Sequence, residues 1–132
     1  MNFPYFHTQY HYVPWLRELE PHPALLIHPE TARKAGIAEG DWAWIETRHG
    51  RARFKATITK RIHPKVLSAC HAWWYPELPA PEHGVFESNA NLLVDPEGAT
   101  DPATGTTELR GLHCRVVRAD GPPEGVEDNK EG

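Results

Sequence analysis

Residues 24–41, ALLIHPETARKAGIAEGD, decide the fold of this 132-residue chain. The apolar run Ala24–His28 is long enough for one buried strand. Pro29 follows at the first position of a helix, where its fixed φ is favourable and its missing N–H costs nothing. Gly36 suits the left-handed residue just past a helix end, and the acidic turn 38–41 leads onward. This stretch therefore predicts a strand, a short helix and a second strand in close succession.

Further strand signals lie on both sides of a predicted hairpin turn at residues 48–51. Residues 42–47 form the first strand of this hairpin. Residues 51–59 alternate between apolar and polar side chains, which is typical of a strand with one solvated face. Another strand is expected at residues 66–73, and a closing strand at residues 112–117. The closing strand is expected to point three side chains inward, those of Leu112, Cys114 and Val116.

Helical signals are few. One helical turn is expected around residues 15–20, and one or two turns around residues 87–94. Residues 95–106 are rich in Pro, Gly, Asp and Thr and should form an exposed loop. Residues 119–132 are acidic with few apolar side chains, which predicts a disordered tail. The sequence thus indicates one mainly β domain, with short helices, at residues 1–118.

The composition argues against several functional classes. Hydrophobic residues make up 39% of the chain, and its 13 prolines and 10 glycines favour short strands and turns over a helix bundle. A net charge of −4 without a long basic run gives nucleic-acid binding little support. No apolar stretch approaches membrane-spanning length. Residues 1–12 lack the features of a signal peptide, so a cytoplasmic location is expected. Cys70 and Cys114 lie in apolar runs and are expected to be buried free thiols.

Four stretches in a fixed order carry a family resemblance: IHPETARKAGIAEGDWAWIET (27–47), HAWWYPE (71–77), ESNANLL (87–93) and LRGLHCRVV (109–117). From about residue 6 to residue 117, the chain resembles the C-terminal, molybdopterin dinucleotide-binding domain of the dimethyl sulfoxide reductase family. The members of this family are molybdenum or tungsten oxidoreductases. The resemblance implies a double-psi β-barrel that binds molybdopterin guanine dinucleotide.

The loop at residues 1–23 holds the first candidate site residues, His7, Thr8 and Gln9. Their donors and acceptors suit the edge of a polar planar heterocycle or a phosphate group. The residues alone favour a polar surface loop over a binding loop. The resemblance reverses this preference, because it places the loop against the pterin.

The second group of candidates is His71, Trp73 and Trp74. Adjacent tryptophans can stack on a bound ring or fill a core, and the residues alone favour the core. Successive side chains of a strand point to opposite faces. We therefore expect one indole to pack inward and the other to reach the cofactor, beside which the resemblance places this segment.

The third group is Ser88 and Asn89, together with Arg110 nearer the end of the chain. An asparagine amide offers paired donor and acceptor atoms that suit a pterin or guanine edge, and a helix N-terminus can face an anion. A simple helix cap is the alternative. The resemblance implies that an asparagine here contacts the cofactor, and Asn89 is favoured over Asn91. Arg110 could bind a diphosphate or lie in a solvated loop, and the sequence leaves both open.

A zinc site is a rival interpretation. His7 and His11 are four residues apart, and the pairs Cys70-His71 and His113-Cys114 could converge on them. However, the chain has no Cys-x-x-Cys or His-Glu-x-x-His motif, and adjacent side chains of a strand point apart. A hydrolase has less support still, because no Gly-x-Ser-x-Gly motif occurs.

Two features that the resemblance implies have no counterpart in the sequence: the family's first strand, upstream of the histidine loop, and the metal ligand and iron–sulfur cysteines of its other domains. An open sheet edge tends to pair with another strand. We therefore expect the remaining domains or the catalytic subunit of an oxidoreductase, or a second copy of the chain, to complete the barrel. The chain alone would not be catalytic but would orient a cofactor that carries the redox chemistry. The alternative is a non-catalytic accessory β-barrel that binds a partner protein through its aromatic N-terminal loop.

Overall fold

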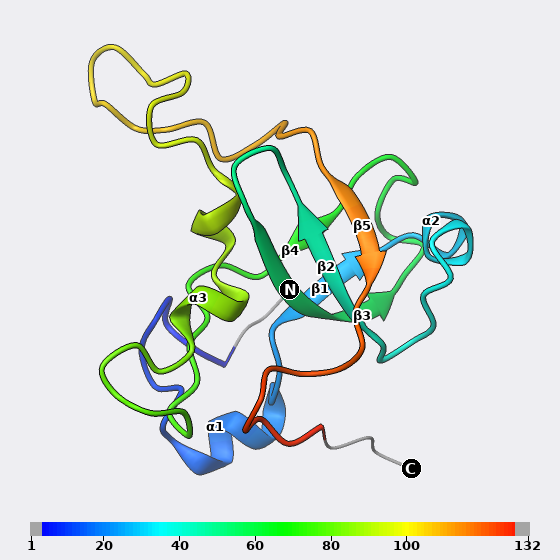
Figure 1. Ribbon diagram of the computed structural model, residues 1–132, viewed down its shortest axis with the longest axis vertical. Helices are drawn as coiled ribbons and strands as arrows, with labels where there is room; N and C mark the ends of the chain where they lie inside the picture. Colours follow the sequence, from blue (N-terminus) through cyan, green and yellow to red (C-terminus); the bar gives the residue numbers. More distant parts are fainter. Residues whose placement is uncertain (1–3, 129–132) are drawn as a thin grey trace.

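The computed structural model describes residues 4–128, which form one five-stranded sheet with short helices around it (Figure 1). The strand order across the sheet is β4-β1-β3-β2-β5. In chain order the elements are α1 (Pro14–Leu19), β1 (Ala24–Ile27), α2 (Pro29–Lys34), β2 (Trp42–Glu46), β3 (Arg51–Ile58), β4 (Ser68–Ala69), α3 (Val85–Ser88), the 3-10 helix η1 (Ala90–Leu93) and β5 (Arg115–Arg118).

The unit β1-α2-β2 has the structure that the sequence predicts. Pro29 opens α2, and the imidazole Nδ1 of His28 accepts a hydrogen bond from the Glu30 N–H at 3.2 Å, which satisfies a free donor at the start of the helix. Gly36 follows the helix with φ 66°, in the left-handed region that favours glycine. The buried Ala32 faces the sheet core, so this short helix is held by packing.

The core lies on one face of the central strands. Along β3, Ala52, Phe54 and Ala56 are buried, as the alternating pattern predicts. β1 pairs with β3 in parallel, and β2 pairs with β3 in antiparallel fashion. On the opposite face, the guanidinium groups of Arg51 and Arg53 lie 4.3 and 4.4 Å from the Trp44 ring centroid. The predicted solvated face is therefore partly covered by its own long side chains.

The segment after β5 is packed against the domain, so the prediction of a disordered tail is wrong for residues 119–128. Val126 belongs to the hydrophobic core, and Lys55 forms an ion pair with Asp128 at 2.9 Å. Arg53 donates hydrogen bonds to the carbonyl oxygens of Gly121 and Pro122 at 3.1 and 2.8 Å. Figure 1 shows this segment running from β5 toward α1. Residues 129–132 lie outside the described part of the chain.

Two predicted strands are shorter than expected. The strand expected at residues 66–73 is reduced to β4, because the chain leaves the sheet and Ala72 adopts a φ of 59°. The closing strand begins only at Arg115, so Cys114 is exposed and not buried, whereas Cys70 is buried as expected. The expected turn near residues 15–20 is α1, and the expected turns near residues 87–94 are α3 and η1.

Three further features complete the comparison. Residues 95–106 project from the domain as a loop (Figure 1) in which most residues are exposed, as predicted. Between residues 4 and 128, the sheet ends at β4 on one side and at β5 on the other, so it does not close. The mainly β class is thus confirmed, but the double-psi barrel is not. Within the same residues, no helix has both the length and the apolar character needed to cross a membrane.

Candidate functional site

Three segments that are distant in sequence meet around Trp73: the loop at residues 4–13, the strand end at residues 70–75, and residues 81–89. They line two adjacent pockets. The first, of about 160 Å³, is called the histidine pocket, and its lining includes Tyr5, His7, His11, Cys70, His71 and Trp73. The second, of about 280 Å³, is called the Trp74 pocket, and its lining includes Thr8, Trp73, Trp74, Glu82, His83 and Asn89.

The indole of Trp73 packs inward and that of Trp74 is partly exposed, although both residues follow β4 and are not part of a strand. Trp73 is 1% exposed and lines both pockets. Trp74 donates a hydrogen bond from Nε1 to the backbone carbonyl of Thr8 at 2.6 Å. This bond ties the N-terminal loop to the strand end and fixes the indole in place.

His11 supports Trp74 through ring stacking and a hydrogen bond. Its ring is buried and stacks on Trp74, with 5.6 Å between centroids and 5° between planes. The Trp74 carbonyl lies 3.1 Å from Nδ1 of His11. Because a carbonyl can only accept, Nδ1 carries the proton in this bond. Burial lowers the pKa of His11 despite this hydrogen bond, so the ring is neutral near pH 7.

His7 and His71 join the loop to the strand end a second time. Nδ1 of His7 lies 3.0 Å from Nε2 of His71, so one ring donates and the other accepts. Within residues 4–128, no three His, Cys, Asp or Glu side chains form a group that could hold a metal ion. The zinc interpretation therefore has no support in this arrangement, and the two histidines pair with each other.

The backbone around the pockets is unusual. Four non-glycine residues within the described range have positive φ, namely His7 (53°), Tyr10 (72°), Ala72 (59°) and His83 (46°). All four lie in the segments that line the pockets or beside them. Such conformations cost free energy and cluster at functional sites. Their position supports a binding role for this face.

Asn89 lies at the break between α3 and η1, with extended backbone angles. Its Oδ1 accepts a hydrogen bond from the Asn91 N–H at 3.0 Å. The Nδ2 donors of Asn89 make no hydrogen bond with any described residue, and the side chain lines the Trp74 pocket. The Asn89 amide is therefore held in place through Oδ1, and its Nδ2 can donate a hydrogen bond to a ligand in this pocket.

Three of the predicted site residues do not line these pockets. Ser88 is fully buried, and its hydroxyl lies 2.7 Å from the Tyr75 hydroxyl, so it supports the core and does not face a ligand. Gln9 and Arg110 are exposed and line neither pocket. Conversely, His83 lines the Trp74 pocket and was not predicted, because its proline-rich loop carries no periodic signal. His11 belongs to the same polar loop as the predicted residues His7, Thr8 and Gln9, and it lines the histidine pocket.

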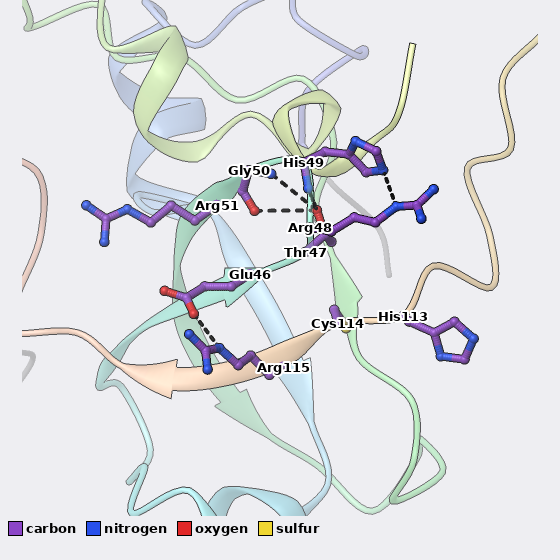
Figure 2. Close-up of a pocket in the computed structure, with 9 residues that line it drawn as sticks. All are labelled: Glu46, Thr47, Arg48, His49, Gly50, Arg51, His113, Cys114 and Arg115. Carbon is purple, nitrogen blue, oxygen red and sulfur yellow. Dashed lines mark hydrogen bonds and ion pairs between the residues drawn. The ribbon is translucent and has the colours of Figure 1, made fainter. Parts of the chain in front are cut away.

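A third hollow, of about 680 Å³, lies at the tip of the β2–β3 hairpin and is rich in arginine (Figure 2). Its charges do not converge. Figure 2 shows Arg48 and Arg51 pointing away from each other, while Arg115 forms an ion pair with Glu46 at 2.6 Å. This hollow is therefore not a preformed anion site.

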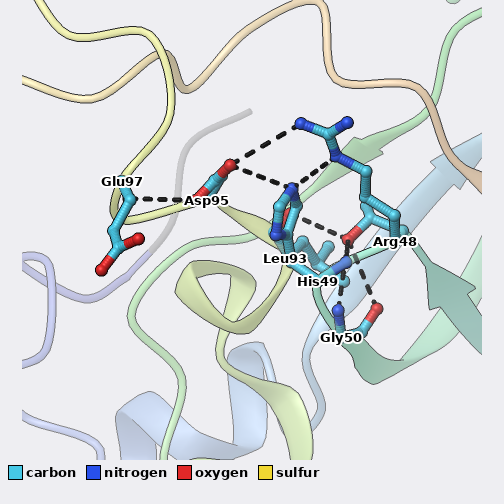
Figure 3. Close-up of polar contacts among 7 residues, drawn as sticks. Arg48, His49, Gly50, Leu93, Asp95 and Glu97 are labelled. Carbon is cyan, nitrogen blue, oxygen red and sulfur yellow. Dashed lines mark hydrogen bonds and ion pairs between the residues drawn. The ribbon is translucent and has the colours of Figure 1, made fainter.

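The same hairpin tip supports the segment that carries Asn89. Thr47 donates a hydrogen bond from Oγ1 to the Leu93 carbonyl of η1 at 2.9 Å. Asp95 lies beside two residues of the tip, with its Oδ2 3.4 Å from His49 Nε2 and 3.7 Å from an Arg48 nitrogen (Figure 3). The hairpin tip thus fixes η1, and η1 begins immediately after Asn89.

Gly50 makes this contact possible, and its replacement by alanine is expected to destabilise the domain. A Cβ at position 50 would lie 2.5 Å from the backbone oxygen of Leu92, and backbone cannot move aside cheaply. We expect a loss of about 1–3 kcal/mol in the free energy of unfolding, as for overpacked cores. Urea denaturation measures this loss. Gly121→Ala is the matched control, because nothing lies within 4 Å of a Cβ there. Equal stabilities of the two variants would contradict the close approach.

Comparisons with known proteins show the family to which this chain is related. A family model described as "Molydopterin dinucleotide binding domain" matches residues 4–113. The chain is 41% identical over 115 residues to dopamine dehydroxylase of Eggerthella lenta, and 34% identical over 111 residues to acetylene hydratase of Syntrophotalea acetylenica. These matches cover 87% and 80% of this chain, but only 11% and 15% of the two relatives.

A solved structure shows the same fold. Acetylene hydratase from Pelobacter acetylenicus matches with a TM-score of 0.83 at 27% identity, over 90% of this chain and 17% of that chain. The present chain thus spans a small part of the length of these relatives. Because the family model covers most of the chain and the fold agrees, the chain belongs to the molydopterin dinucleotide binding domain family of the dimethyl sulfoxide reductase-type molybdenum and tungsten oxidoreductases.

Proposed function

We propose that the histidine pocket and the Trp74 pocket together form the surface on which this domain holds molybdopterin guanine dinucleotide within a larger oxidoreductase. The observation that carries the proposal is the convergence of three distant segments on Trp73, with a free amide donor at Asn89. The relatives named above, a dopamine dehydroxylase and an acetylene hydratase, are many times longer than this chain. The cofactor, when bound, would supply the redox chemistry at its metal.

The residues of this surface suit such a cofactor. The partly exposed Trp74 offers aromatic area, and the Asn89 amide can donate to a heterocycle oxygen or nitrogen, whereas the buried Trp73 would position the walls of both pockets from the core. The His7–His71 pair can donate and accept at the edge of a ring. With Thr8, these are the residues that we propose hold and orient the dinucleotide. Gln9 and Arg110 remain predictions for parts of the dinucleotide that extend beyond the two pockets. Ser88 would affect cofactor binding only indirectly, through its contact with the Tyr75 hydroxyl in the core.

We also propose that the sheet becomes the double-psi barrel of the family when it is completed from outside the described residues. Both of its edges, β4 and β5, lack a further strand within residues 4–128. Unpaired edges favour the addition of a strand. The missing strand would come from the remaining polypeptide of the oxidoreductase or from a second copy of this chain.

Asn89→Ala tests the proposed site. We expect the variant to retain at least tenfold less molybdopterin guanine dinucleotide, which corresponds to about 1.4 kcal/mol of binding free energy. Occupancy is measured by the fluorescence of the oxidised pterin released from the purified oxidoreductase. Asn91→Ala is the matched control, because the Asn91 side chain is exposed and lines neither pocket. Unchanged occupancy in the Asn89 variant would favour the accessory-module alternative, which the comparisons do not otherwise support.

A further inference from the structure

Helix α1 exposes its apolar side chains. Trp15 and Leu19 lie four residues apart on one side of the helix, whereas Leu16 is half-buried, and Tyr12 lies two residues before the helix begins. Tyr12, Trp15 and Leu19 are 64%, 69% and 70% exposed, respectively. We call these three residues the α1 apolar face. No residue of α1 is buried, and Figure 1 shows the helix at the margin of the domain, away from the sheet.

The charged side of α1 faces inward instead. The Arg17 guanidinium lies 5.3 Å from the Trp73 ring centroid and 5.9 Å from the Tyr75 ring centroid. Arg17 also forms an ion pair with Glu77 at 2.7 Å. An amphipathic helix of an isolated domain normally has the opposite orientation, with its apolar stripe against the core.

Polar contacts fix this orientation. The Tyr5 hydroxyl lies 3.2 Å from the Leu16 carbonyl and 2.7 Å from the Glu20 carbonyl, so the C-terminal part of the helix is held against the N-terminal loop. Rotating α1 to bury Trp15 and Leu19 would break these contacts and the Arg17–Glu77 pair. The α1 apolar face is therefore held outward by the fold itself. A cluster of large apolar side chains held in this way is typical of an interaction surface.

We propose that the α1 apolar face docks on the remaining polypeptide of the oxidoreductase, an inference that rests on the proposed function. The relatives supply the argument for this occupant, because the matched region is only 11–15% of their length and a large body lies outside it. Further exposed aromatic side chains precede this face in the sequence, namely Phe6, which lines the histidine pocket, and Tyr10.

The chemistry of the docking partner follows from the same side chains. Glu18 lies beside Leu19 on the exposed side of α1 and forms no ion pair with the described residues. The partner surface is therefore apolar, with a basic side chain opposite Glu18.

Photocrosslinking of the protein purified from cells tests this proposal. The photoreactive residue p-benzoylphenylalanine is placed at position 15, where an exposed aromatic side chain already stands. We expect crosslinks, identified by mass spectrometry, to peptides of the oxidoreductase outside these 132 residues. Leu19→Glu should lower the crosslink yield at least tenfold, because it places a carboxylate against the apolar part of the partner surface. The matched control is the same photoreactive residue at position 109, which is also exposed but distant in sequence.

The outcomes separate this proposal from the proposed function. Crosslinks to a second copy of the chain, or no crosslinks to protein, would overturn the docking proposal even if the protein contains the pterin. Crosslinks to the larger polypeptide in a protein without pterin would support docking and overturn the cofactor assignment. A Leu19→Glu variant that crosslinks as well as the parent would show that the α1 apolar face is not the contact.

Discussion

Trp73→Ala is expected to lower the free energy of unfolding by about 3–5 kcal/mol, the cost typical of removing a large buried aromatic side chain. Trp73 is fully buried and contacts the rings of Tyr5, His11 and Tyr75. It also lies under the Arg17 guanidinium. Because these neighbours belong to different segments, none of them can fill the cavity without moving another. Urea denaturation measures the loss.

Two variants serve as controls for Trp73. Trp73→Phe keeps an aromatic ring and should lose much less stability than the alanine variant. Trp15→Ala removes the same side chain from an exposed position and should change stability by less than about 0.5 kcal/mol in the isolated chain. If the Trp73 and Trp15 alanine variants were equally stable, the indole of Trp73 would not be the centre of the packing described above.

Stability is expected to fall as the pH is lowered below 6.5, because His22 is buried in its neutral form. The side chain is 6% exposed, and neither ring nitrogen has a hydrogen-bond partner among the described residues. Burial above all, and the Lys55 charge to a smaller extent, lower the pKa of His22 from 6.5 to about 4, while Asp128 opposes the shift. The stability contributed by neutral His22 is therefore fully present above pH 6.5 and is lost progressively as the pH falls from 6.5 to about 4. The loss amounts to about 3 kcal/mol.

Unfolding free energies at pH 7 and pH 4 measure this effect. His22→Gln cannot be protonated, so the difference between parent and variant should depend on pH in the predicted direction. His113→Gln is the matched control, because His113 is exposed and its replacement should leave the pH dependence unchanged. An identical pH dependence in the parent and in the His22 variant would show that His22 is solvated or paired in the folded protein.

Local patterns predicted the central part of the fold correctly. The β1-α2-β2 unit is encoded by short-range signals, namely a proline at the helix start and a glycine after its end. β3 follows from strict alternation. The strand expected at residues 66–73 failed because an apolar run does not reveal where its hydrogen-bonding partner ends. β4 pairs with only two residues of β1, and the chain then turns at Ala72.

The candidate site was only partly predictable for a similar reason. Tryptophans and an asparagine are conspicuous residue types, so Trp73, Trp74 and Asn89 could be selected from the sequence. Ser88 looked equivalent to Asn89, but adjacent residues point in different directions, and only the structure shows that Ser88 faces Tyr75. His11 and His83 have no local signature. Their positions depend on where the loop at residues 4–13 and the loop at residues 78–84 meet the strand end.

The contacts of Arg53 show which residues a shortened version of this domain would have to keep. Its guanidinium forms an ion pair with Glu87 in α3 at 2.7 Å, and it also bonds the carbonyl oxygens of Gly121 and Pro122. A boundary drawn at residue 113, where the family model ends, would remove β5 and two acceptors of this arginine, together with the core side chain Val126. Residues 114–128 and helix α3 are thus one cooperative unit, and any excised version of the domain must retain both.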